Sequence, residues 1–284
     1  MPKVAIVSDS IACRTNELVE QYKIGIVPIM LLVQGKLYRD MLDITPSEAY
    51  ELFLQDPDSF NTSPSAPGHY FEAYREASNR AKNILCVTLS SKLSTGYDMA
   101  RVAKEQAETE LPETSIEVLD SQTTTAAEGF VALAAARAAA EGKSFTEVMK
   151  VAEEVRDKVS FLLVLDTIRH VYRTGRIPKV ASQVGSMLKI KPILTSSSGL
   201  VRFKGVVRNR EHGINRLLKM MRDKVGQSPV HVAVMHAYCP DEAEKLRERI
   251  SSEFNCAELW VTGFSLVMGY ATGTGTLGFA FYKD

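Results

Sequence analysis

Short apolar runs and longer helical segments alternate along the first half of the chain. The apolar runs, at residues 4–7, 84–89 and 116–119, are rich in Val, Ile and Leu, and polar side chains follow each of them at once. Helical patterns occupy residues 46–54, 69–81, 96–110 and 126–141, and a Ser144–Glu147 capping box opens another helix that runs to about residue 159. This order predicts a parallel sheet with crossover helices.

The pattern changes after residue 160, where strands follow one another more directly. Strands are expected at residues 161–165, 190–195, 200–203, 205–207, 230–236, 258–261 and 277–282, and helices at 179–188, 211–225 and 240–254. We therefore predict an α/β fold with two domains. Residues 1–160 would form a three-layer α/β/α domain with a mostly parallel sheet, and residues 161–284 a two-layer α/β domain with a mixed sheet.

Composition narrows the class of protein. The chain has 284 residues, of which 45% are hydrophobic and 24% charged, as expected of a soluble globular protein with room for two domains. No apolar stretch approaches the ~20 residues of a membrane span, and the first residues lack the organisation of a signal peptide. The four cysteines form no C-x-x-C pair, which is typical of free thiols in a reducing compartment. We expect a cytoplasmic protein without a zinc site or a nucleic-acid surface.

One window of the chain concentrates positive charge. The chain as a whole is neutral, with 34 basic and 34 acidic residues, yet residues 167–210 contain no Asp or Glu. The basic residues of this window are Arg169, Arg173, Arg176, Lys179, Lys189, Lys191, Arg202, Lys204, Arg208 and Arg210. Such an asymmetry creates a local field that attracts an anion or an acidic partner surface. The ordinary alternative is a solvated face with scattered basic residues.

Hydroxyl and carboxylate side chains follow the predicted strands. They occupy residues 8–10, 90–91 and 120–121, and a further cluster at residues 61–67 is expected in a loop. Ligands of open α/β sheets gather at the carboxyl edge of the strands. Several hydroxyls that converge there can hold a carboxylate without a metal. The ordinary alternative is that Ser and Thr cap helices, which we expect of Ser10.

Two other classes of function stay open on the residues alone. A hydrolase or acyl-transfer enzyme would use Ser94 or Ser91 as nucleophile with a distant histidine, although the chain contains no G-x-S-x-G elbow. A binder of a small phosphorylated metabolite would hold the phosphate among Arg173, Arg176 and Arg208.

Eight short strings occur in a characteristic order along the chain. They are VAIVSDS (4–10), YRDMLDITPSEAY (38–50), TSPSAP (62–67), SSKLSTGY (90–97), LDSQT (119–123), LDTIRHVYRTGRI (165–177), LKIKPIL (188–194) and MGYATGTGTLG (268–278). Each string alone is weak, but their joint order and spacing resemble the DegV family over essentially the entire chain.

The resemblance implies a function as well as a fold. Members with an assigned role are the fatty-acid-binding subunits of bacterial fatty acid kinase. It implies two domains with a long acyl chain buried between them, no cofactor and no catalysis by the chain itself. A separate ATP-dependent kinase would phosphorylate the carboxylate of the bound fatty acid to an acyl phosphate.

Individual residues carry over from the family strings. Thr62 matches the Thr of the family's TSQPS string and Ser94 the Ser of its SSGLSGTY string, so both resemble carboxylate ligands, with Ser63 and Ser91 beside them. The head-group rim or kinase contact is expected at Arg173, Arg176, Arg208, Ala271, Gly273 and Gly275.

The chain departs from the family at its last motif. Ala271 stands where kinase-linked members have a histidine, and an Ala side chain can neither transfer a proton nor hydrogen-bond. The TSPSAP string also lacks the family's Gln, and residues 94–97 read STGY in place of SGTY. The resemblance therefore implies fatty acid binding more directly than coupling to a kinase.

Overall fold

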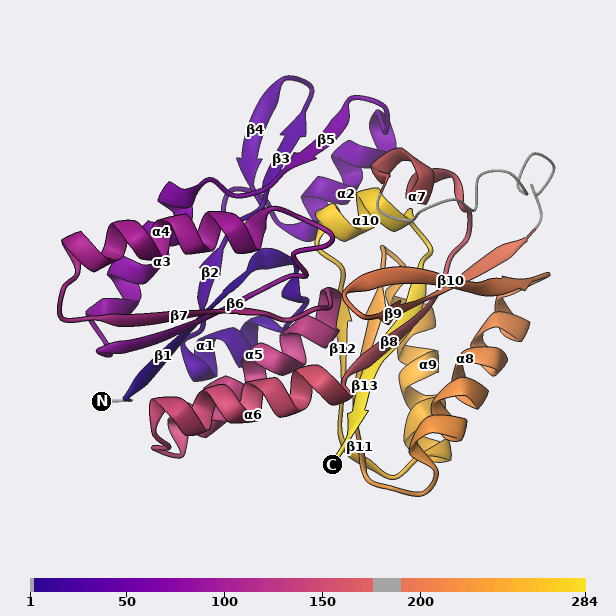
Figure 1. The fold of residues 1–284 in the computed structure, drawn as a ribbon. Coiled ribbons are helices and arrows are strands. Elements are labelled where there is room, and N and C mark those ends of the chain that lie inside the picture. Colours follow the sequence, from indigo (N-terminus) through magenta and orange to yellow (C-terminus); the bar gives the residue numbers. More distant parts are fainter. Residues whose placement is uncertain (1–2, 176–189) are drawn as a thin grey trace.

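The chain folds around two main β-sheets that lie side by side (Figure 1). The computed structural model describes residues 3–175 and 190–284, apart from the side chains of Tyr172 and Arg173. Strands from the first half of the chain form a parallel sheet, and strands from Ser160 onward form a mixed sheet. The predicted α/β class is confirmed, and we propose the domain boundary at residue 160, where the chain enters the mixed sheet.

The first sheet is parallel throughout. Its strands and surrounding helices are β1 Val4–Asp9, β2 Gly25–Val27, β6 Asn83–Thr88, β7 Ser115–Asp120, α1 Asn16–Tyr22, α3 Pro67–Ser78, α4 Gly96–Glu110 and α5 Thr125–Ala140. The strand order is β2-β1-β6-β7. Every residue of β1 is buried, as in a strand that is covered on both faces. The helices α3 and α4 cover one face and α5 the other (Figure 1), so this half has three layers.

The second sheet is mixed. Its strands and helices are β8 Ser160–Val164, β9 Lys191–Ser197, β10 Leu200–Val207, β11 Val230–His236, β12 Cys256–Gly263, β13 Leu277–Lys283, α6 Phe145–Lys158, α8 Arg210–Val225 and α9 Pro240–Glu253. The order is β10-β9-β8-β13-β11-β12, and only β11 and β12 run parallel among these described strands. The helices α8 and α9 pack on this sheet, and so do α5 and α6, which precede β8 in the sequence.

The helix α5 joins the two halves. It contacts β1 and β6 of the parallel sheet as well as β8 and β13 of the mixed sheet. Its Ala-rich sequence suits this position, because a helix that is apolar all round is stable only when it is buried all round. Gly129 allows the closest approach, since a Cβ there would lie 2.2 Å from the carbonyl oxygen of Ala12. In the last turn, Arg137 forms a bidentate pair with Glu258 of β12 at 2.8 and 2.6 Å.

A small antiparallel sheet is inserted between β2 and β6. It consists of β3 Met30–Val33, β4 Lys36–Arg39 and β5 Phe60–Ser63, in the order β4-β3-β5. The helix α2 Pro46–Gln55 lies between β4 and β5 in the sequence. The expectation of a loop over residues 61–67 is therefore wrong for residues 61–63, which belong to β5, and for Pro67, which begins α3. The pairing sets Thr62 directly opposite Leu31 of β3, which fixes where the Thr62 side chain lies.

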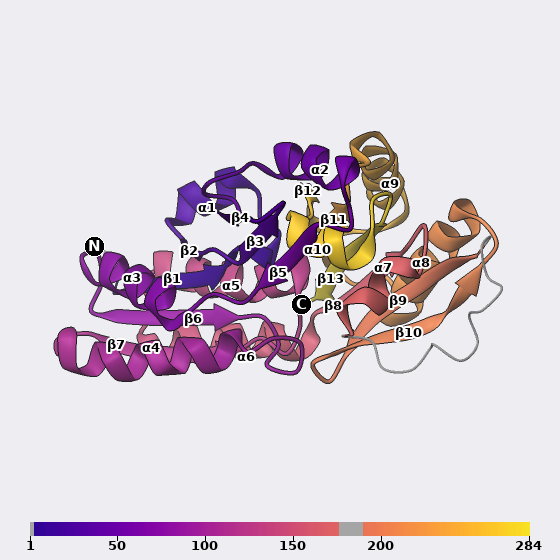
Figure 2. The same cartoon turned by 90° about the horizontal axis from the view of Figure 1, so that it is seen from above.

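Three short helices complete the junction between the halves. They are η1 Ser10–Ala12, a 3-10 helix, and the α-helices α7 Arg169–Thr174 and α10 Leu266–Thr272. The helix α10 packs against α2, α7 and β5, and Figure 2 shows it between the two main sheets. None of the helices within residues 3–175 and 190–284 is both long and apolar enough to cross a membrane.

One further detail differs from the sequence expectations. The strands expected at residues 200–203 and 205–207 form one strand, β10, whose pairing with β9 is irregular between Phe203 and Gly205. Gly205 has φ +124°, so the backbone bends there without ending the strand. The helix expected at residues 179–188 lies outside the described residues.

Candidate functional site

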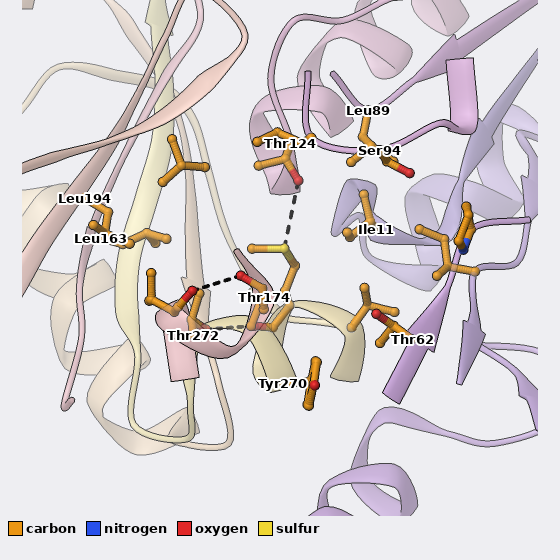
Figure 3. A pocket seen from close by; sticks show the side chains of 18 of the residues that line it. Ile11, Thr62, Leu89, Ser94, Thr124, Leu163, Thr174, Leu194, Tyr270 and Thr272 are labelled. Atoms are coloured by element: carbon orange, nitrogen blue, oxygen red, sulfur yellow. Dashed lines mark hydrogen bonds between the residues drawn. The ribbon is translucent and has the colours of Figure 1, made fainter. Parts of the chain in front are cut away.

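A cavity of about 180 Å³ lies where the two halves of the chain meet. The elements η1 and β5 and the loop after β6 form one side of it, and β8, β9 and α7 form the other, with α10 between them (Figure 3). Segments from widely separated parts of the sequence thus enclose one space. A site at the junction of two structural units is a common place for a small-molecule ligand.

The interior of the cavity is mainly apolar, apart from the hydroxyls of Thr124, Thr174 and Thr272. Buried side chains from both halves line it, including Ile11, Leu89, Phe161, Leu163 and Leu194. These side chains cannot hydrogen-bond a ligand, so this region suits a hydrocarbon and excludes a strongly hydrated group.

One end of the cavity also carries neutral polar side chains, beside Ile11 and Leu89 (Figure 3). Asn61, Thr62 and Ser63 come from β5, and Ser94 comes from the turn before α4. Figure 3 shows Thr62 and Ser94 on one side of the cavity, and Leu163 and Leu194 on the other. The Ser94 Oγ accepts a hydrogen bond from the Gly96 N–H at 3.3 Å, which leaves its own proton for a ligand.

Charge is absent from the described part of the cavity lining. It includes no Asp, Glu, Lys, Arg or His. Serine hydrolases need a base beside the nucleophile, and here no histidine joins Ser94 in the lining. The described residues likewise contain no group of His, Cys, Asp and Glu side chains that could hold a metal ion. The described lining is thus neutral, with hydroxyl and amide groups beside apolar side chains.

Asp9 holds two parts of the cavity wall in place. It is fully buried at the end of β1 and accepts hydrogen bonds from the Ile11 N–H at 3.1 Å and from the Leu89 N–H at 2.9 Å. Ile11 and Leu89 both line the cavity. One carboxylate therefore fixes two pieces of its wall that are far apart in sequence.

A second buried carboxyl group, that of Glu128, lies beside Asp9 in the first turn of α5. Burial raises the pKa of both groups, and that of Glu128 to well above its usual range. The two backbone N–H bonds favour the ionised form of Asp9, and the buried guanidinium of Arg14 lies close to both. We therefore place the negative charge on Asp9 and the proton on Glu128. This pair was not predicted from the sequence, although Glu128 is the one acid within the apolar run at residues 126–136.

Ser10 supports another part of the wall. Its Oγ donates to Asp40 at 2.6 Å and accepts from the N–H of Ile29, a cavity residue, at 3.1 Å. The expectation that Ser10 is a cap is wrong, because the Asp9 carboxylate caps the short helix instead. Burial raises the pKa of Asp40 to about 6.

Comparison with known proteins agrees with this architecture. The model of the DegV family, whose description is "Uncharacterised protein", matches residues 3–284. The chain belongs to the DegV family. A DegV domain-containing protein of Clostridium perfringens is 30% identical over 283 residues, covering 99% of both chains. The protein DegV of Bacillus subtilis is 28% identical over 279 residues, covering 97% of both.

Solved DegV structures share the whole fold. A DegV family protein from Thermus thermophilus, described by its fatty acid binding, has a TM-score of 0.89 and 27% identity, covering 99% of this chain and all of the other. DegV from B. subtilis, described as a fatty acid binding protein, has a TM-score of 0.89 and 26% identity over the full length of both chains. A stearic-acid-binding protein from Eubacterium ventriosum, at 24% identity, also shares the fold with a TM-score of 0.89.

The residues expected to bind the carboxylate divide into two groups in this DegV protein. Thr62, Ser63 and Ser94 lie together at the polar end of the cavity. Ser91 is exposed, and its Oγ donates to Asp120 at 2.6 Å, so it does not belong to the described lining. That these residues hold a carboxylate stays a prediction.

The residues expected at the rim are more scattered. Ala271 lines the cavity, whereas Arg208 is exposed near the end of β10 and does not. Gly273 and Gly275 also lie outside the lining. Both have positive φ, and a Cβ on Gly273 would lie 2.5 Å from the His170 ring, so they shape the turn behind α10. The side chain of Arg173 and the whole of Arg176 lie outside the described residues.

Proposed function

We propose that this DegV protein binds one long-chain fatty acid in the cavity and has no catalytic activity of its own. The observation that carries the proposal is an apolar interior that ends in a cluster of uncharged hydroxyl and amide groups, Asn61, Thr62, Ser63 and Ser94. DegV proteins of T. thermophilus and B. subtilis that share the fold are described as binding fatty acids.

The two ends of the cavity would have different tasks. Burial of ~14 methylene groups at ~0.8 kcal/mol each is a gross gain of ~11 kcal/mol, from which the lost freedom of the chain removes several. The tail therefore supplies the affinity. Thr62 and Ser94 would orient the carboxylate by hydrogen bonds, and, being neutral, they leave its oxygens nucleophilic.

The cavity must widen to hold a complete tail. Its volume of about 180 Å³ is below the ~300–1,000 Å³ of typical small-molecule sites. Met268 and Leu93 have flexible side chains in the lining and can change rotamer to make room. The proposal thus includes a rearrangement of side chains on binding.

Removal of the head-group hydroxyls tests the proposal. We expect Thr62→Val and Ser94→Ala each to weaken the binding of palmitate or oleate by about tenfold or more, because each removes a hydrogen bond to a charged group. Ser91→Ala is the matched control, since it removes a serine hydroxyl outside the cavity, and it should bind as the parent does. Affinities can be measured by displacement of a fluorescent fatty acid. Equal affinity in all three variants would contradict the assignment of the carboxylate site.

The finer proposal is that the bound carboxylate is presented to a separate ATP-dependent fatty acid kinase. The exposed basic side chains Arg202, Lys204 and Arg208 lie along and just after the edge strand β10, and such a surface favours association with an anionic, ATP-loaded partner.

Ala271 makes the kinase proposal testable. Because Ala271 lines the cavity and offers no hydrogen bond, we expect slow formation of acyl phosphate when the protein is mixed with ATP and a bacterial fatty acid kinase. Ala271→His should raise the rate at least tenfold, since an imidazole can orient the carboxylate or move a proton. An unchanged rate in the variant, with fatty acid bound, would contradict the role given to this position.

A further inference from the structure

Besides Thr62, three threonine residues line the cavity, and the hydroxyl of one of them differs from the other two. The Thr174 Oγ1 donates to the carbonyl oxygen of Val171 at 3.0 Å, and the Thr272 Oγ1 donates to that of Met268 at 2.8 Å. The Thr124 Oγ1 instead points at the sulfur of Met268, at 3.9 Å. A thioether is a weak acceptor, so the Thr124 hydroxyl lacks the strong acceptor that the others have.

The Thr124 hydroxyl also makes no hydrogen bond that caps the helix beside it. Thr124 is the N-cap residue of α5, but its side chain makes no capping hydrogen bond. It is 2% exposed, and a buried hydroxyl without a good partner costs about 1–3 kcal/mol. A valine would fill the same space without that cost, so the hydroxyl is not explained by packing.

The position of this hydroxyl indicates what it could bind. Figure 3 shows it directed into the cavity toward Met268, between the polar end at Ser94 and the apolar end at Leu163. A ligand whose carboxylate lies at Thr62 and Ser94 would pass its hydrocarbon chain close to this point. An ordinary saturated chain offers no partner there.

We infer that Thr124 recognises a hydroxyl group on the acyl chain, so that the cavity prefers a hydroxylated long-chain fatty acid to a plain one. This inference rests on the proposed function. The chain hydroxyl would accept a hydrogen bond from the Thr124 Oγ1 and donate its own proton to the Met268 sulfur. A site built to hydrogen-bond a substituent disfavours ligands that lack it, because its own polar group then stays poorly paired.

The test compares stearate with a series of octadecanoic acids that carry one hydroxyl at different carbons. For the parent protein we expect at least one positional isomer to bind about tenfold more tightly than stearate. In Thr124→Val that ratio should fall to about one, with stearate itself bound somewhat more tightly. Thr124→Ser, which keeps the hydroxyl, should keep the preference.

The outcomes separate this inference from the proposed function. Stearate that binds while no isomer is preferred would overturn the role of Thr124 and leave fatty acid binding intact. A preference that persists in Thr124→Val, or a dependence on Thr124 seen for oleate instead, would also overturn it. Failure of stearate and every isomer to bind would refute the fatty acid proposal itself. Thermal unfolding without ligand checks that the variant is folded, and Thr124→Ala, which removes the same hydroxyl, takes its place if it is not.

Discussion

At the scale of single residues, buried polar side chains hold parts of the cavity wall in place by hydrogen bonds to their backbone. Asp9 holds Ile11 and Leu89 in place through their backbone N–H groups, while Ser10 holds Ile29. Residues 8–10 were expected from the sequence to be a polar cluster at the end of a strand. Their partners could not be predicted, because Leu89 and Ile29 come close to them only once the tertiary structure has formed. Polar residues at a strand end thus support the site here without lining it.

Two buried carboxyl groups give a prediction at this scale. We expect Asp9→Asn to lower the free energy of unfolding by about 2–4 kcal/mol, because the amide NH2 would face one of the two backbone donors and Arg14 would lose its counter-charge. Glu128→Gln is the matched control and should cost less than about 1 kcal/mol, since burial raises the pKa of Glu128 and we assign the proton of the pair to it. Urea unfolding at pH 7 measures both. A larger loss for Glu128→Gln than for Asp9→Asn would show that the charge lies on Glu128.

At the scale of elements, most helices and strands were predictable, but several short ones were not. The helix α4 was expected at residues 96–110 and lies at Gly96–Glu110, and the Ser144–Glu147 capping box forms as expected. The strands β2 to β5 and the helix α10 were not predicted, because each has three to seven residues and depends on pairing or packing with distant segments. The predicted Ala-rich helix was found, but its place between two sheets follows from burial on every side and not from its propensity.

The close approach of α5 to η1 gives a prediction for these elements. Gly129→Ala should destabilise the protein by about 1–3 kcal/mol, because its methyl group would overlap the Ala12 carbonyl oxygen and the backbone would have to move. The control is Gly68→Ala near the start of α3, where a Cβ meets nothing within 4 Å and the stability should be unchanged or slightly higher. Thermal melts of both variants check this. A Gly129→Ala protein as stable as the parent would contradict the packing of α5 on η1.

At the scale of the whole molecule, the cavity exists because two halves of the chain close on each other. Part of the candidate site could be predicted by resemblance, since Thr62, Ser63, Ser94 and Ala271 all line the cavity. The apolar lining could not be assigned, because residues such as Phe161 and Leu194 look like ordinary core positions in the sequence. Ser91 resembled a ligand but turns away toward Asp120, which no local pattern indicates.

A pair of hydrogen bonds joins the two halves beside the cavity. The Ser90 Oγ donates to the carbonyl oxygen of Gly199 at 2.7 Å, and the Lys92 Nζ donates to that of Ser198 at 2.8 Å. Leu93 and Ser94 of the same loop line the cavity, and so does Val201, just beyond the β9–β10 turn. The two bonds therefore hold together two walls of the site.

Release of this contact should speed the exchange of ligand. We expect Ser90→Ala to raise the dissociation rate of a bound fatty acid several-fold, because the loop and the turn can then separate more easily. The neighbouring variant Ser91→Ala, which leaves the contact intact, should show the parent rate. Stopped-flow transfer of a fluorescent fatty acid to an acceptor membrane measures both rates, and equal rates in the two variants would contradict a gating role for Ser90.

The most direct test of the central claim is native mass spectrometry of the protein purified from bacterial cells, followed by extraction and identification of any lipid. The account predicts a mass excess equal to one long-chain fatty acid per polypeptide, which is lost when Thr62→Val and Ser94→Ala are combined. A parent protein that shows only the mass of the bare polypeptide, and takes up no added palmitate or oleate, would contradict it.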